Sequence, residues 1–235
     1  MGPSVTRDES VSYRMKPLII FDLDGTLVDS KKDLCASVNY VRQRYGLPVL
    51  ADSAIAGLIG DGAHKLIERA LEAHGSARNV RDALQTFLDY YRAHMLDATD
   101  LYEGVRETLD VLVDCDMAVL TNKPYLFSCA LLDGLGIYDY FLAVYGGNSF
   151  RQKKPDPVGV FRILSDAGAD PEATWIVGDS AVDVLTGRNA GITTCGVTYG
   201  YAADTFEDTP PDFLIDKFPQ LEDLMRRLVA RGGSL

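Results

Sequence analysis

Two carboxylates that follow a short apolar run are the first residues with the spacing expected of a reaction centre. Leu18–Phe21 predicts a buried strand, and Asp22, Asp24 and Gly25 come directly after it. Because alternate residues of an extended chain share a face, both carboxylates can meet one ligand, while Gly25 permits a sharp exit of the chain. Open α/β sheets bind ligands at the carboxyl ends of their strands. A simple polar turn is the alternative interpretation, since Asp and Gly are common in turns.

Three further groups of polar residues each follow a later apolar run. They are Thr121-Asn122, Lys154-Pro155, and Gly178-Asp179-Ser180 with Asp183. Each group also has an ordinary structural interpretation. Asp179 is a suitable helix cap, Lys154 a solvated surface lysine and Thr121 a turn residue. Taken one at a time, these residues leave the functional and the structural interpretations open.

The string Asp22-Leu23-Asp24-Gly25-Thr26, followed in order by these three groups, resembles the motifs of the haloacid dehalogenase superfamily. The resemblance extends from Leu18 to about Leu228. It implies a Mg²⁺-dependent phosphate monoester hydrolase that works through an aspartyl-phosphate intermediate. A motif match of this kind predicts a function only when its structural context is also present, and here each group follows a predicted strand.

By this resemblance, three residues are catalytic. Asp22 is the nucleophile, and Asp24 is the acid that protonates the leaving oxygen and the base that activates water. Lys154 neutralises charge between nucleophile and phosphate, and its position directly before Pro155 favours it over Lys153, which is left to the solvent. Family members that cleave carbon-halogen or carbon-phosphorus bonds lack the second Asp, so Asp24 favours phosphate ester chemistry.

The resemblance also implies a metal site and a phosphate site. Asp22 and Asp179, with the main-chain oxygen of Asp24, offer the hard oxygen ligands that Mg²⁺ prefers, and Asp183 orients its waters. The four-residue spacing of Asp179 and Asp183 predicts that both lie on one face of an early helical turn. The predicted substrate-binding residues are Thr121, Asn122, Lys154, Gly60, Asp61 and Gly62.

The elements that must position these residues alternate between strand and helix along the chain, which predicts an α/β fold with a doubly wound, parallel, Rossmann-like sheet. About 95 residues separate the first strand from the second, far more than one crossover needs. Helical spacing there predicts helices over Lys31–Tyr45, Ala63–His74 and Val80–Met95. The later predicted strands are Met117–Leu120, Leu142–Tyr145, Trp175–Val177, Thr194–Val197 and Phe213–Ile215.

These patterns predict a domain organisation. Residues 16–30 and 98–235 form the α/β core with the catalytic site, and residues 31–97 form an inserted all-helical cap. The glycine-rich loop from Gly57 to Gly62 can reach from the cap toward the site. Residues 1–15 are polar and are expected to be a disordered extension.

Composition limits the classes of partner. A formal net charge of −11 repels nucleic acid and anionic lipid, so neither is an expected partner. The four cysteines lie far apart, and no apolar stretch has the length of a membrane helix, which together indicate a cytoplasmic protein. We expect a small phosphorylated metabolite as the partner and a monomer or homodimer as the assembly.

Several strings resemble phosphoglycolate phosphatases in particular, and they make 2-phosphoglycolate or a similar small metabolite the expected substrate. They are Ile59–Ala63, Thr121–Pro124, Gly146-Gly147, Lys153–Pro157 and Thr198–Tyr201. Pyrophosphatases and sugar-phosphate phosphatases share similar cores and stay open as alternatives. A phosphohexomutase is disfavoured, because Leu34 stands where those enzymes carry a His. A non-catalytic regulator is disfavoured too, since every charged motif residue is present.

Overall fold

The computed structural model describes residues 16–72 and 80–231. The predicted extension over residues 1–15 and the predicted helix end at His74 lie outside the described residues. Among the described residues, no helix combines the length and the apolar character needed to cross a bilayer.

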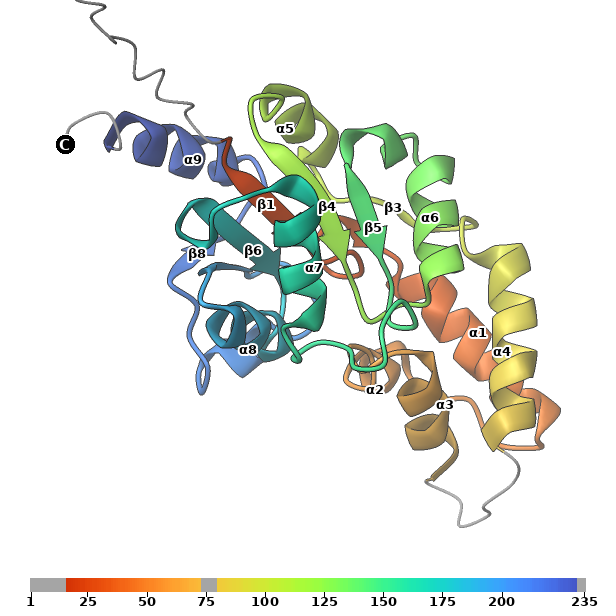
Figure 1. Ribbon diagram of the computed structural model, residues 1–235. Helices are drawn as coiled ribbons and strands as arrows, with labels where there is room; N and C mark the ends of the chain where they lie inside the picture. Colours follow the sequence, from red (N-terminus) through yellow and green to blue (C-terminus); the bar gives the residue numbers. More distant parts are fainter. Residues whose placement is uncertain (1–15, 73–79, 232–235) are drawn as a thin grey trace, which may run out of the picture.

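A six-stranded sheet with all its strands parallel forms the centre of the molecule (Figure 1). Its spatial order is β5-β4-β1-β6-β7-β8, so the chain builds outward from β1 in one direction and then returns to build in the other. This reversal beside β1 confirms the predicted doubly wound α/β fold. The strands are β1 Leu18–Phe21, β4 Asp116–Leu120, β5 Ala143–Tyr145, β6 Thr174–Gly178, β7 Thr193–Val197 and β8 Phe213–Ile215.

The central strands are buried on both faces, which is why they appear in the sequence as continuous apolar runs. Leu18 and Ile20 pack on one face with Val160 and Ile163 of α7. Ile19 and Phe21 point to the opposite face, into the larger core beneath α5, α6 and α9. The helices that flank the sheet are α5 Val105–Val111, α6 Tyr125–Gly134, α7 Val158–Ala167, α8 Ala181–Ala190 and α9 Gln220–Arg231, with short 3₁₀ turns at Tyr138–Tyr140, Pro171–Ala173 and Ala203–Phe206.

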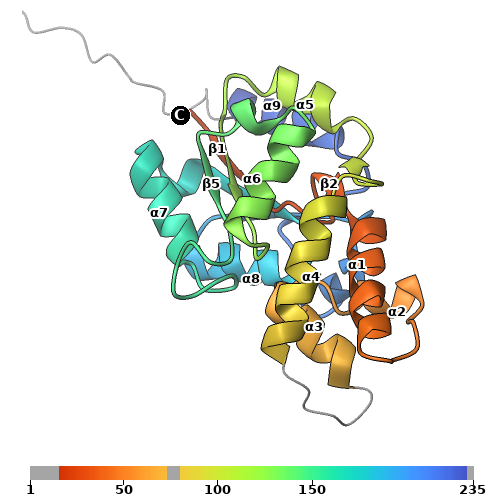
Figure 2. The same ribbon diagram turned by 90° about the vertical axis from the view of Figure 1, so that its right-hand side faces the viewer.

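Between β1 and β4 the chain forms a group of helices that lies to one side of the sheet (Figures 1 and 2). These helices are α1 Lys31–Arg44, α2 Asp52–Ala56, α3 Ala63–Glu72 and α4 Val80–His94. α4 packs against both α1 and α3, and α1 also contacts α2. The sequence did not predict α2, because five residues are too few to show helical periodicity. The residue boundaries of a separate cap domain stay a prediction.

The two segments that join these helices to the core run side by side. β2 (Val28–Asp29) pairs antiparallel with β3 (Asp100–Leu101). Beside this pair, the buried carboxylate of Asp33 accepts hydrogen bonds from the main chain of Ala98 (3.0 Å) and from the main chain and hydroxyl of Thr99 (2.9 and 2.7 Å). The segment that leaves the core after β1 and the segment that returns to it before α5 are therefore hydrogen-bonded to each other where they join the core.

Candidate active site

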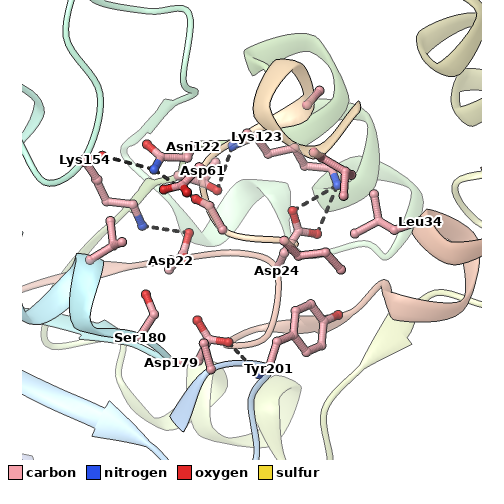
Figure 3. Close-up of a pocket in the computed structure, with 18 of the residues that line it drawn as sticks. Asp22, Asp24, Leu34, Asp61, Asn122, Lys123, Lys154, Asp179, Ser180 and Tyr201 are labelled. Carbon is pink, nitrogen blue, oxygen red and sulfur yellow. Dashed lines mark hydrogen bonds and ion pairs between the residues drawn. The ribbon is translucent and has the colours of Figure 1, made fainter. Parts of the chain in front are cut away.

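A pocket of about 260 Å³ opens where the carboxyl ends of β1, β4 and β6 face the inserted helices (Figure 3). Its position at the reversal of strand order is where open α/β sheets bind ligands. Nine of the ten predicted site residues line it: Asp22, Asp24, Gly60, Asp61, Gly62, Thr121, Asn122, Lys154 and Asp179. The tenth, Asp183, lies behind the lining and contacts Lys154.

Asp22 extends the line of β1, and its main-chain N–H donates to the carbonyl of Val177 on β6 (2.9 Å). The Lys154 ammonium lies 2.9 Å from Asp22 Oδ1 and 2.6 Å from Asp183 Oδ1, so one buried cation links two carboxylates. The adjacent Lys153 is exposed and donates instead to the carbonyl of Asp61 (3.0 Å). The structure thus gives the two lysines different surroundings, with Lys154 lining the pocket and Lys153 outside its lining.

Three carboxylates gather beside Lys154. Oxygens of Asp22, Asp179 and Asp183 lie within 4.8 Å of one another. The Asp179 carboxylate also accepts from the main-chain N–H of Tyr201 (2.7 Å). It lies so close to Gly25 that a Cβ there would come within 2.1 Å of Asp179 Oδ2, and Gly25 has a left-handed φ of +83°. Glycine is therefore required at position 25 both by the close contact with Asp179 and by the left-handed backbone conformation.

The start of α8 brings Asp183 into this cluster by a route that differs from the predicted one. Asp179 precedes the helix, so the expectation that it shares a helical face with Asp183 was wrong. Ser180 is the N-cap, and its main chain and hydroxyl donate to Asp183 Oδ2 (3.2 and 2.8 Å) in a capping box. Gly178 makes room for this carboxylate, since a Cβ there would lie 2.1 Å from Asp183 Cγ.

Burial and mutual repulsion govern the electrostatics of the cluster. Burial raises the pKa of Asp22 to about 6, and nearby Lys154 offsets part of that rise. Burial, followed by repulsion from Asp183 and Asp22, also raises the pKa of Asp179 well above its usual value. Burial alone would lower the pKa of Lys154, but Asp183 and Asp22 raise it, so the lysine stays charged. One cation against three carboxylates leaves an excess of negative charge.

The donor set of this cluster fits a hard divalent cation. Its ligand atoms are carboxylate oxygens, which Mg²⁺ prefers. Asp22 Oδ1 is buried and, despite its ion pair with Lys154, receives no hydrogen bond of good geometry from the described residues. A cation would satisfy that oxygen and reduce the repulsion that raises the pKa values of Asp22 and Asp179. The Asp24 carboxylate does not join the cluster, so its predicted metal role concerns its main-chain oxygen.

The Asp24 carboxylate is held by residues to which the sequence analysis gave no role of their own. Both of its oxygens lie 3.0 Å from the Lys123 ammonium, and Ser30 Oγ donates to Oδ1. Lys123 also donates to the hydroxyl of Tyr91 on α4 (2.7 Å). Lys123 stands two residues beyond Thr121, so the alternation that linked Asp22 with Asp24 was a usable signal for it. No local pattern indicated Tyr91.

Thr121 and Asn122 connect the end of β4 to the rest of the site. Thr121 Oγ1 accepts from the main-chain N–H of Lys123 (3.2 Å), which fixes its hydroxyl at the pocket wall. The Asn122 amide donates to the carbonyls of Gly60 (3.1 Å) and Lys154 (3.2 Å). Asn122 therefore joins two strand ends and also the glycine-rich loop, which reaches the core as the sequence indicated.

The loop itself forms part of the pocket rim. The Asp61 carboxylate pairs with Arg69 of α3, and both side chains are well exposed. Gly62 lies against the core, because a Cβ there would come within 2.9 Å of the Asn122 carbonyl. The predicted substrate-binding stretch thus faces the pocket mainly with backbone.

Comparison with known proteins identifies relatives of this chain. A family described as haloacid dehalogenase-like hydrolase matches residues 19–197. A phosphoglycolate phosphatase of Agrobacterium fabrum is 36% identical over 229 residues, which cover 95% of this chain and 98% of that protein. One from Pseudomonas putida is 40% identical over 191 residues, covering 78% of this chain and 70% of that protein.

A solved structure shows the same architecture. The crystal structure of a predicted phosphoglycolate phosphatase from Haemophilus somnus has a TM-score of 0.85 and 31% identity with this chain. The alignment covers 90% of this chain and 99% of the other.

Proposed function

This chain belongs to the haloacid dehalogenase-like hydrolase family, and we propose on that basis that it is a Mg²⁺-dependent phosphatase whose main substrate is 2-phosphoglycolate. The observation that carries the proposal is the placement of Asp22 and Asp24 in one pocket, each beside its own buried lysine. The names of the relatives from Agrobacterium and Pseudomonas support the choice of substrate.

The proposed reaction has two steps. In the first, the Asp22 carboxylate attacks phosphorus, the bond from phosphorus to the ester oxygen breaks, and Asp24 donates a proton to the departing oxygen. In the second, Asp24 takes a proton from water, whose oxygen attacks the aspartyl-phosphate. Phosphate leaves and the Asp22 carboxylate is regenerated.

The remaining residues stabilise the charge that develops. Lys154 lies against Asp22 and can neutralise a phosphoryl oxygen, and the Thr121 hydroxyl with the adjoining main chain can hold another. Mg²⁺ bound by Asp22, Asp179 and the Asp24 main-chain oxygen, with Asp183 behind them, would supply Lewis-acid stabilisation of the phosphoryl group. Residues of the inserted helices line one side of the pocket, where they would limit the access of bulk water during the reaction.

Other activities remain alternatives, and the substrate panel described below distinguishes them. Leu34 lines the pocket, so the position that carries a His in phosphohexomutases holds an apolar side chain here (Figure 3). A sugar phosphate or pyrophosphate would use the same core residues. We place the enzyme in the cytoplasm as a monomer or homodimer, consistent with its four free cysteines.

The test is phosphate release from 2-phosphoglycolate, pyrophosphate, sugar phosphates and p-nitrophenyl phosphate, with Mg²⁺ or with a chelator. We expect Mg²⁺-dependent release, highest with 2-phosphoglycolate and absent in Asp22→Asn. Preference for another ester would replace the substrate and retain the mechanism. No release by folded wild-type protein would refute the proposed function.

A further inference from the structure

Lys123 is a buried cation at the boundary between the sheet and the inserted helices. Its side chain is only 4% exposed, and its ammonium contacts the Asp24 carboxylate on one side and the Tyr91 hydroxyl on the other. Figure 3 shows Lys123 and Asp24 meeting across the pocket from Lys154 and Asp22. The pocket thus has a second buried cation, and the proposed reaction steps give its ammonium no contact with the substrate.

The Tyr91 hydroxyl has a proton to offer. It accepts from Lys123 (2.7 Å), and within the described part of the chain no acceptor is recorded for its own O–H. Burial raises the pKa of Tyr91 to about 12, so the hydroxyl keeps this proton at neutral pH. Its ring is fixed between Phe87 (centroids 5.6 Å apart) and Phe127 (5.5 Å). Tyr91 lines the pocket, so a donor held rigidly beside a cation faces it.

This pair lies where the leaving group of the substrate must be. Asp24 has to contact the ester oxygen to protonate it, and Lys123 contacts both oxygens of Asp24. A group one carbon away from the ester oxygen therefore falls beside Lys123 and Tyr91. The nearby walls are apolar, with Leu34 and Phe127 among them, which strengthens an ionic interaction there.

The pocket's other lysine and its arginine are placed for different roles. Lys154 is committed to Asp22 and Asp183 on the phosphoryl side. Arg69 stands at the rim, pairs with Asp61 and is 39% exposed. Lys123 contacts the proposed acid Asp24 directly, whereas Arg69 pairs with Asp61 at the rim.

We infer that Lys123 and the Tyr91 hydroxyl form a subsite for a carboxylate on the leaving group, one carbon from the ester oxygen. The inference rests on the proposed function and assigns the residues that would recognise the carboxylate of 2-phosphoglycolate or of another phosphate ester of a 2-hydroxy acid. Tyr91 donates its O–H to the carboxylate, and Lys123 supplies the opposing charge. Tyr91 belongs to α4, so the inserted helices take part directly in recognising the substrate.

The test compares 2-phosphoglycolate with ethyl phosphate, which has the same length but a methyl group in place of the carboxylate. The measured quantity is the ratio of their kcat/KM values, with Mg²⁺ present. Tyr91→Phe removes only the hydroxyl, and Lys123→Met removes the charge. Tyr90→Phe is the matched control, because Tyr90 is the next residue on α4 but stacks on Tyr40 instead (centroids 4.0 Å apart).

We expect Tyr91→Phe to lower the ratio by about tenfold, through a higher KM for 2-phosphoglycolate, and Lys123→Met to lower it by about a hundredfold. Tyr90→Phe leaves the ratio unchanged. An equal loss on both esters would overturn the inference and make these residues positioning groups for Asp24. Equal use of both esters by the wild-type enzyme would overturn it too, with the phosphatase intact. Release from neither ester would instead reject 2-phosphoglycolate as the substrate, and with it the part of the proposed function on which the inference rests.

Discussion

Replacing Lys154 with methionine tests the electrostatics of the pocket most directly. The change keeps the length of the side chain and removes a charge whose side chain is only 2% exposed. Removing one partner of a buried ion pair costs about 3 to 5 kcal/mol, because the other charge is left uncompensated. Here Asp22 and Asp183 are both left without their ammonium. We expect the metal-free variant to lose about 3 kcal/mol of stability, at the lower end of that range.

This loss corresponds to a measurable shift in melting temperature. An average unfolding entropy scaled to a chain of this size gives about 0.5 kcal/mol per degree, so the expected decrease is about 6 °C. The assay is thermal unfolding in the presence of a chelator. Adding Mg²⁺ should recover part of the decrease, since a cation held by Asp22 and Asp179 replaces some of the missing positive charge.

Lys153→Met is the control, because this neighbour is exposed and contacts only the Asp61 carbonyl among its recorded partners. Its expected effect on stability is below about 0.5 kcal/mol. Phosphate release should fall by about a hundredfold or more in Lys154→Met and stay near the wild-type rate in the control. Equal decreases in the two variants, in either melting temperature or activity, would refute the conclusion that Lys154, and not Lys153, neutralises the buried carboxylates.

Two further predictions concern the same cluster. Burial raises the pKa of Asp22 from 3.8 to about 6, so the folded protein loses stability as the pH rises between these two values and Asp22 ionises. Below about pH 6, protons compete with the metal ion for this carboxylate. Mg²⁺ should therefore raise the melting temperature more at pH 8 than at pH 5, and an equal rise at both pH values would contradict the metal role of Asp22. Gly178→Ala should lower stability by about 1 to 3 kcal/mol and reduce activity, because the new Cβ would lie 2.1 Å from Asp183 Cγ. A urea titration and a rate measurement test it, and unchanged values in both would show that α8 moves aside freely.

The sheet and the main site residues were predictable because their signals are local. Most strands of the sheet are short apolar runs, and Asp22, Thr121 and Asp179 each follow such a run directly. α2, β2 and β3 were missed because two to five residues carry too little periodicity.

The parts of the site that depend on distant contacts were not predictable from one sequence. Tyr91 meets Lys123 from a helix that lies 32 residues earlier in the chain, and nothing in its own neighbourhood distinguishes it from Tyr90. The prediction that Asp179 and Asp183 share one face of a helix was wrong because the sequence did not show where that helix begins. Their spacing suggested a continuous helix, whereas the N-cap at Ser180 starts the helix after Asp179.

The side-by-side course of the two connecting segments has an engineering consequence. β2 and β3 are paired, and Asp33 fastens the outgoing chain to Ala98 and Thr99 on the return. An insert whose two ends meet can be exchanged without interrupting any strand of the six-stranded sheet. We expect a chimera that carries the corresponding helices of a relative to fold on this core and to take its substrate preference from the donor. The chimera would keep the reaction of the core if the donor helices also supply the contacts that Asn122, Lys123 and Lys153 make with the insert.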